Sequence, residues 1–296
     1  MADREARRFQ ATLRGALTGW WLGQSGFVLG CGGATVAIDP FLTPDPRRRY
    51  AVPASAQDLA GLDAVLVTHE HRDHLDLPAL LELVRVDPKV KIVVPRAIMD
   101  HVIREGLPMR AVVGAGPGDE LSFGSRKAIR VWPVPSRHAV HFPPVKYDFG
   151  LIEGGGHYRF LGYVIDVDGV RVYHSGDSID YEGLAETLRD RAVDALFLPI
   201  NGRDAEREAN DLVGNFTEAE AVDLARRSAA RWVVPMHYEM YPHNPGDPGH
   251  FVSLLRDAAP DVACMLPAHG EPFVLGRVRS QVLLNEEAER GASIGR

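Results

Sequence analysis

The fold of this 296-residue chain is decided by the stretch Ala64-Val65-Leu66-Val67-Thr68-His69-Glu70-His71-Arg72-Asp73-His74. Its first part, 64–68, is apolar and predicts a buried strand that leads directly into the polar part. The polar part brings four potential ligands within six residues, and the spacing of His69 and His71 lets both imidazoles turn to one side. Asp73 and His74 extend the turn toward a second point. The stretch therefore predicts a site for two adjacent metals at a strand end, in preference to a merely polar turn.

Composition limits the class of protein. With 45% hydrophobic and 25% charged residues, we expect one folded domain spanning 1–296. The net charge of −7 argues against a stable nucleic-acid partner or a broadly membrane-coating surface, which would need basic residues. Cys31 and Cys264 are too few for a disulfide scaffold, which favours the cytoplasm. Residues 1–14 lack the apolar run of a secretory signal, and no apolar run is long enough to predict a membrane span.

The pattern along the chain alternates between strands and helices. Gly32-Gly33 between two apolar stretches, 26–31 and 34–41, predicts a hairpin, and Asp168-Gly169 predicts another between 162–167 and 170–174. Thr217 and Glu220 form a capping-box pattern at a helix start. The remaining predicted strands are 91–95, 129–134, 195–200, 232–236 and 263–267, and the predicted helices are 77–86, 97–105, 181–191, 217–228, 251–258 and 281–290. This order predicts an α/β fold with two β-then-α halves.

Further motifs produce a family resemblance. His-x-His-x-Asp-His after a strand that ends in Thr resembles the signature of the metallo-β-lactamase superfamily, and the likeness covers almost the whole chain. Segments similar to its later motifs follow in order: Pro135-Ser136-Arg137-His138, Ser175-Gly176-Asp177 and Pro235-Met236-His237. Together with the 210–217 stretch, the segments 173–177 and 235–238 resemble the L-ascorbate-6-phosphate lactonase-like branch. The N-acylphosphatidylethanolamine phospholipase D type is similar in metal motif and layout.

The resemblance implies an αββα sandwich, with two mixed β-sheets flanked by helices. It also implies one metal on His69, His71 and His138, a second on Asp73, His74 and His237, and Asp177 as the bridge. Nitrogen and carboxylate ligands suit two zinc ions, with manganese or iron as compatible alternatives. Asp73, Asp177 and His237 are the expected catalytic residues, acting with a hydroxide shared by the metals.

The implied activity is that of a metal-dependent hydrolase that opens a lactone or ester of a small acid or sugar, with a phosphorylated substrate as one option. The alternative is a phosphodiesterase that acts on nucleic acid or lipid at the same dinuclear site, because such a site also serves displacement at phosphorus. A third alternative, a metal-binding scaffold without activity, is disfavoured by the complete ligand set. The resemblance also makes a homo-oligomer an option.

A small-molecule anionic substrate is expected, with Arg203, His141, His243 and Tyr238 as its contacts. Each has an alternative: His141 could replace His138 as a ligand, Arg203 could be solvated, and Tyr238 and His243 could simply pack. Three further features stay open in the sequence. His174 is either a partner of a ligand or a buried structural residue, Arg47-Arg48-Arg49 is either a solvated loop or a receiver of anions, and Trp20-Trp21 belongs either to the core or to the substrate rim.

Overall fold

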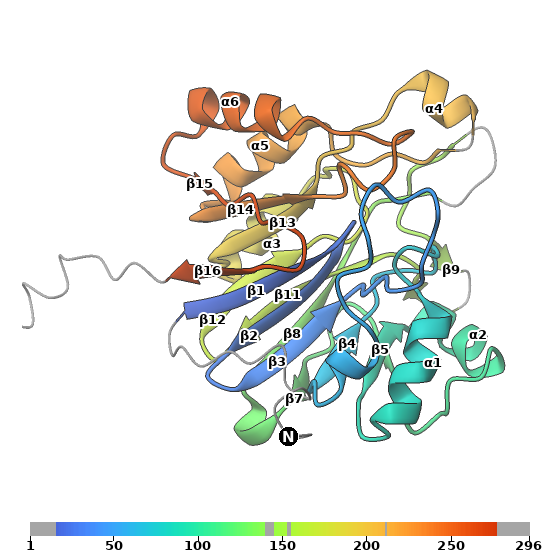
Figure 1. Ribbon diagram of the computed structural model, residues 1–296. Helices are drawn as coiled ribbons and strands as arrows, with labels where there is room; N and C mark the ends of the chain where they lie inside the picture. Colours follow the sequence, from blue (N-terminus) through green and yellow to red (C-terminus); the bar gives the residue numbers. More distant parts are fainter. Residues whose placement is uncertain (1–15, 140–144, 153–154, 211, 277–296) are drawn as a thin grey trace, which may run out of the picture.

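The chain forms two facing β-sheets with helices on their outer sides (Figure 1). The computed structural model describes residues 16–139, 145–152, 155–210 and 212–276. Both sheets are mixed and each has seven strands. The expected αββα sandwich is thus confirmed. Within the described ranges, no helix is both long enough and apolar enough to cross a membrane.

The first sheet contains the amino-terminal hairpin. In its parallel part, β4 (Ala64–Leu66) lies between β3 (Ala34–Ile38) and β5 (Ile92–Pro95). The polar stretch after β4 therefore emerges where these three strands have their carboxyl ends. Helices α1 (Leu77–Val86) and α2 (Met99–Arg104) accompany it, together with short 3-10 turns at Gln57–Leu59 and Arg96–Ile98. In spatial order, the strands are β16 (Pro272–Gly276), β1 (Ala16–Gly23), β2 (Gly26–Cys31), β3 (Ala34–Ile38), β4 (Ala64–Leu66), β5 (Ile92–Pro95) and β6 (Val112–Ala115).

The second sheet contains three parallel strands, β12 (Val170–His174), β13 (Ala195–Pro199) and β14 (Trp232–Met236). Their carboxyl ends lie at the same edge of this sheet. Helices α3 (Leu184–Asp190), α5 (Glu218–Ser228) and α6 (Pro248–Ala258) pack on it, α4 (Ala205–Ala209) lies in a connection, and a 3-10 turn spans Ser125–Lys127. In spatial order, the strands are β15 (Ala263–Cys264), β14 (Trp232–Met236), β13 (Ala195–Pro199), β12 (Val170–His174), β11 (Leu161–Val167), β8 (Ile129–Pro135) and β7 (Leu121–Phe123). A small hairpin joins β9 (Leu151–Ile152) to β10 (His157–Tyr158).

Alternation along the strands divides the apolar side chains between two clusters. Trp21 and Phe27 belong to the cluster that includes strands of both sheets, whereas Trp20 and Val28 belong to the cluster that includes buried residues of α1 and α2. Because successive side chains of a strand point to opposite faces, adjacent tryptophans enter different layers. The open question about Trp20-Trp21 is therefore answered in favour of the core.

Turn and cap predictions are confirmed where glycine or a capping side chain determines the geometry. Gly32 and Gly33 have φ values of +57° and +91°, and Asp168 and Gly169 have φ values of +47° and +89°, as the predicted tight turns require. Thr217 and Glu220 make both bonds of the capping box.

Several predicted boundaries were wrong. β1 and β16, which pair with each other, were not predicted as strands. The helix expected at 97–105 is a 3-10 turn followed by a shorter α-helix, and the last predicted strand, 263–267, is ordered as a strand over Ala263–Cys264 only. The predicted helix at 281–290, the amino-terminal stretch 1–14 and His141 lie outside the described residues.

Candidate metal centre

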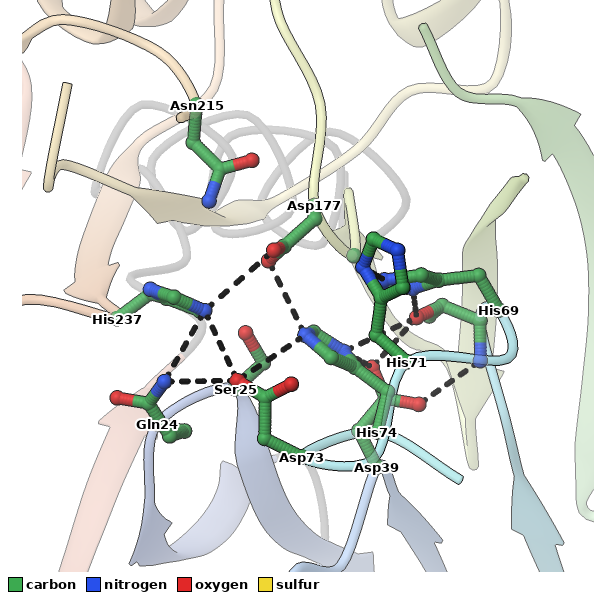
Figure 2. Close-up of polar contacts among 12 residues, drawn as sticks. Gln24, Ser25, Asp39, His69, His71, Asp73, His74, Asp177, Asn215 and His237 are labelled. Carbon is green, nitrogen blue, oxygen red and sulfur yellow. Dashed lines mark hydrogen bonds and ion pairs between the residues drawn. The ribbon is translucent and has the colours of Figure 1, made fainter. Parts of the chain in front are cut away.

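The predicted ligands all follow the ends of strands. His69 to His74 come after β4, His138 after β8, Asp177 after β12 and His237 after β14. Since the carboxyl ends of these strands meet at one edge of the sandwich, side chains more than a hundred residues apart converge there (Figure 2). The structure brings all seven predicted ligands together in two groups, one of His69, His71, His138 and Asp177, the other of Asp73, His74 and His237.

The first group contains three imidazoles and the carboxylate of Asp177. Nε2 of His69 lies 2.9 Å from Nδ1 of His71, and Nε2 of His138 lies 3.3 Å from the same atom. Four ligands arranged tetrahedrally around zinc at about 2.0–2.1 Å are about 3.3 Å from one another. The separations of these nitrogen atoms therefore fit ligands of one metal ion.

The second group meets the first at Asp177. Nε2 of His237 lies 3.4 Å from Oδ2 of Asp73 and 3.4 Å from Oδ2 of Asp177. The same Oδ2 of Asp177 is 3.8 Å from Nε2 of His138, in the first group. Oδ1 of Asp177 and Nε2 of His74 are both buried and 3.3 Å apart, yet their orientation makes no hydrogen bond between them. Such atoms fit ligands that are directed at shared metal positions rather than at each other.

Asp39 fixes the orientation of His74. Its Oδ2 lies 2.7 Å from Nδ1 of His74, and its carboxylate also accepts hydrogen bonds from the backbone N–H of Thr68 at 2.8 Å and from the Thr68 hydroxyl at 2.6 Å. The side chains of Asp39 and His74 are fully buried. A carboxylate on Nδ1 holds the imidazole in the tautomer whose Nε2 is free to ligate a metal.

Burial and neighbouring charges set the pKa values of the ligands in opposite directions. Burial lowers the pKa of His138 to about 3, and burial together with the charges of His74 and His71 lowers the pKa of His69 well below its usual value. These imidazoles are neutral, as metal ligands must be. Burial acts in the same direction on His74, but the charges of Asp177 and Asp39 outweigh it and raise its pKa well above the usual value. A metal at His74 must therefore displace a proton.

Gln24 and His237 form a second supporting contact. The amide nitrogen of Gln24, Nε2, donates to Oδ2 of Asp73 at 2.8 Å and lies 3.1 Å from Nε2 of His237. The backbone N–H of His237 donates to the Gln24 carbonyl at 3.1 Å, and His237 has a φ of +59°. This left-handed conformation is unfavourable for a residue other than glycine, and such strain gathers at functional sites.

Close packing fixes the loop that carries Asp177. Gly176 has a φ of +59°, and a Cβ on this residue would lie 2.7 Å from the Cβ of Thr68. Only glycine fits there without displacing the Thr68 side chain, which precedes the first histidine ligand. His174 lies behind this loop, fully buried, with its Nε2 2.8 Å from the Ser25 carbonyl and its Nδ1 accepting from the Gly176 N–H. It is a buried residue that holds the loop.

The centre opens into a cavity of about 300 Å³. Ligands His71, Asp73, Asp177 and His237 form its floor, and its walls are Gln24, Phe41, Arg47, Arg72, Leu212, Val213, Tyr241, His243 and Asn244. A volume at the lower end of the range for ligand pockets suits a small molecule.

The structure places the four predicted substrate contacts differently. His243 lines the cavity, and Tyr241 beside it stacks on its ring, with the two ring centroids 5.3 Å apart. Tyr238 instead packs in the core against Trp21, with ring centroids 5.1 Å apart. Arg203 does not reach the cavity, because its guanidinium pairs with both carboxylate oxygens of Glu220, at 2.5 and 2.6 Å. The position of His141 is outside the described residues.

Sequence reasoning missed Asp39 and Gln24. Asp39 does carry a signal, since it is a charged residue at the end of an otherwise apolar strand, where a buried carboxylate needs partners. Gln24 lies in the tight turn between β1 and β2, and β1 was not predicted. No sequence pattern connects such a turn with residues two hundred positions away.

Comparison with known proteins agrees with this geometry. Residues 34–238 match the family model described as a beta-lactamase superfamily domain. A UPF0173 metal-dependent hydrolase of Thermococcus onnurineus is 30% identical over 243 residues, which are 81% of this chain and 92% of that protein.

Solved structures share the fold at lower sequence identity. Igni18, a metallo hydrolase of the archaeon Ignicoccus hospitalis, has a TM-score of 0.65 with 22% identity and covers 88% of this chain and 98% of its own. CmlA, a diiron β-hydroxylase of Streptomyces venezuelae, has a TM-score of 0.62 with 17% identity, covering 89% of this chain and 54% of its own. The fold alone thus does not determine the reaction. From the family match and the relative of 30% identity, the chain belongs to the beta-lactamase superfamily and, within it, to the UPF0173 metal-dependent hydrolases.

Proposed function

We propose that this metal-dependent hydrolase holds two divalent ions and hydrolyses an ester or lactone of a small molecule. The position of Asp177 is the observation that carries the proposal. One of its oxygen atoms lies 3.8 Å from His138 in the first group of ligands and 3.4 Å from His237 in the second. A carboxylate between two groups of ligands is the arrangement that a pair of bridged ions needs.

His69, His71 and His138 would hold one ion, Asp73, His74 and His237 the other, and Asp177 would serve both. This set of imidazoles and carboxylates suits zinc, with manganese or iron as alternatives. Bound at this site, such ions would lower the pKa of a water from about 15.7 to about 7 and stabilise negative charge on a substrate oxygen.

The side chains around the ligands prepare the site for that chemistry. Asp39 keeps Nε2 of His74 directed to the centre, and Gln24 holds the carboxylate of Asp73. His243 and Tyr241 line the cavity together with the ligands, where they would contact a bound substrate. Fixed ligands and a shaped cavity reduce the reorganisation that would otherwise accompany the reaction.

Two observations favour an ester or lactone over a phosphodiester of nucleic acid. The cavity is small, about 300 Å³, and the net charge of −7 argues against the broad basic surface that a polyanion needs. The resemblance to the lactonase-like branch points the same way. The substrate assay includes a phosphodiester, so it also tests the phosphodiesterase alternative.

Metal content tests the number of ions. After loading with zinc and removal of excess metal, atomic emission should find two equivalents in the wild type, one in His237→Gln and two in His101→Gln, a control at an exposed histidine outside the site. A single equivalent in the wild type would contradict the dinuclear site.

A substrate panel tests the reaction. Lactones, para-nitrophenyl esters and bis(para-nitrophenyl) phosphate are offered to the same zinc-loaded and manganese-loaded samples, with His237→Gln as the inactive reference. We expect turnover of esters or lactones. Turnover of the phosphodiester alone would favour the phosphodiesterase alternative instead.

A further inference from the structure

The mouth of the cavity carries two guanidinium groups that share one carboxylate. Arg47 and Arg72 both line the cavity, and both lie next to Asp45. Nε and Nη2 of Arg47 donate to the two oxygens of Asp45 at 2.9 and 2.6 Å, and Nη1 of Arg72 is 3.5 Å from the second of these oxygens. Two positive charges thus face one negative charge, which leaves an excess of positive charge at the mouth.

Each guanidinium is held in place by an aromatic ring. Arg47 lies 5.6 Å from the ring centroid of Tyr241, and Arg72 lies 5.9 Å from that of Phe41. Asp45 between them has a side chain only 3% exposed, whereas Arg47 and Arg72 are 61% and 63% exposed. The buried carboxylate and the two rings therefore hold the guanidinium groups themselves, while most of each arginine side chain stays exposed at the cavity. This preparation reduces the entropy lost when a ligand binds.

Donor groups remain for a ligand. Arg47 uses only one edge of its planar fork on Asp45, and within the described residues its Nη1 has no hydrogen-bond partner. Arginine presents five N–H donors in a geometry that matches an oxyanion. Arg72 stands between the predicted ligands His71 and Asp73 in the chain and lines the same cavity as both.

We propose that Arg47 and Arg72 bind an oxyanion group of the substrate, so that the hydrolysed molecule is an ester or lactone carrying a carboxylate or phosphate. This inference rests on the proposed function and adds the substrate class and two specificity-determining residues to it. The susceptible bond lies at the metal ligands while the anionic end is held at the mouth.

The neighbouring arginines do not share this position. Arg48 points into the protein, where its Nη1 donates to the Phe41 carbonyl at 3.1 Å, and burial lowers its pKa. Arg49 is exposed and does not line the cavity. Arg49→Gln is therefore a matched control, because it removes the same charge two residues from Arg47 but outside the mouth.

Two esters that differ in one group test the proposal. Para-nitrophenyl valerate is neutral, and para-nitrophenyl glutarate has the same five-carbon acyl chain ending in a carboxylate. With zinc-loaded enzyme, kcat/KM is measured for both esters in the wild type, Arg47→Gln, Arg72→Gln and Arg49→Gln. Zinc content is checked in each variant, because Arg72 adjoins two ligands.

We expect the wild type to favour the carboxylated ester and Arg47→Gln to lose about tenfold in kcat/KM for it, as the loss of a charge-assisted hydrogen bond implies. Its value for the neutral ester should stay within about twofold, and Arg49→Gln should keep the preference. Equal losses on both esters, or an equal loss in Arg49→Gln, would overturn the proposal while leaving the hydrolase function intact.

Binding of glutarate decides the case in which neither ester is hydrolysed. Isothermal titration of glutarate into zinc-loaded wild type, Arg47→Gln and Arg49→Gln measures the anion site without turnover. Weakening by about tenfold in Arg47→Gln alone would support the anion site even though the ester hydrolase function had failed. Binding that is absent, or unaffected by Arg47→Gln, would overturn the anion site itself.

Discussion

Asp39→Asn should weaken one of the two metal positions while leaving the shape of the site almost unchanged. The carboxylate of Asp39 accepts from Nδ1 of His74 and from two donors of Thr68, all within 2.8 Å. An asparagine has one acceptor oxygen and one donor amide in the same space. Whichever way the amide turns, it presents an N–H to a group that is itself a donor.

The magnitude follows from the hydrogen bond that is lost. When the amide faces Nδ1 of His74, this nitrogen must accept, and the proton moves to Nε2, the atom directed at the metal centre. A charge-assisted hydrogen bond contributes about 1.5–3 kcal/mol, and loss of such a partner of a metal ligand weakens affinity about 10- to 100-fold. Because the Asp39 and His74 side chains are fully buried, water cannot replace the contact.

Competition with a chromogenic chelator measures the effect. Titration of zinc into the wild type should give two binding phases, of which Asp39→Asn weakens the one that involves His74. Asp63→Asn is the control, since Asp63 is also a carboxylate that accepts a backbone N–H, from Thr35 at 2.9 Å, but lies outside the site. Affinities within about twofold of the wild type for both ions in Asp39→Asn would refute the role assigned to Asp39.

Two further results are expected. Gly176→Ala should lower the free energy of unfolding of the metal-free protein by about 2–4 kcal/mol in a denaturant titration, through positive φ and the clash with Thr68. Gly169→Ala, which also has positive φ but open space around its Cβ, should lose about 1–2 kcal/mol, and equal losses would disprove the clash. Because carboxylates outweigh burial and raise the pKa of His74, His74 is protonated without metal at neutral pH. Zinc binding should then release a proton at pH 7 and weaken as the pH falls, whereas calorimetry in buffers of different ionisation enthalpy that finds no release would contradict this.

Four of the predicted ligands could be found in the sequence because metal chemistry leaves a dense local pattern. His69, His71, Asp73 and His74 occur within six residues after an apolar strand, a density that is typical of a metal site and rare in a merely polar turn. His138, Asp177 and His237 came only from resemblance. Nothing in the local pattern around His138 separates it from His141.

The substrate contacts show where local reasoning fails. Arg203 lies in a loop after a strand, a typical place for a site residue, yet both terminal nitrogens of its guanidinium donate to Glu220 of α5. Arg47, one of three identical neighbours, reaches the cavity because Asp45 and Tyr241 hold it there. Which carboxylate or ring each arginine contacts depends on the tertiary structure.

By itself, the sequence determined the α/β order, the tight turns at glycine and the local cluster of ligands, since each depends on residues close together in the chain. Only the tertiary structure decided that β1 pairs with β16, that Asp39 and Gln24 support the ligands, and that Arg47 rather than Arg203 faces the cavity. These contacts join segments that are separated along the chain. They form when the strands are buried against each other, so the sequence of one segment alone does not predict them.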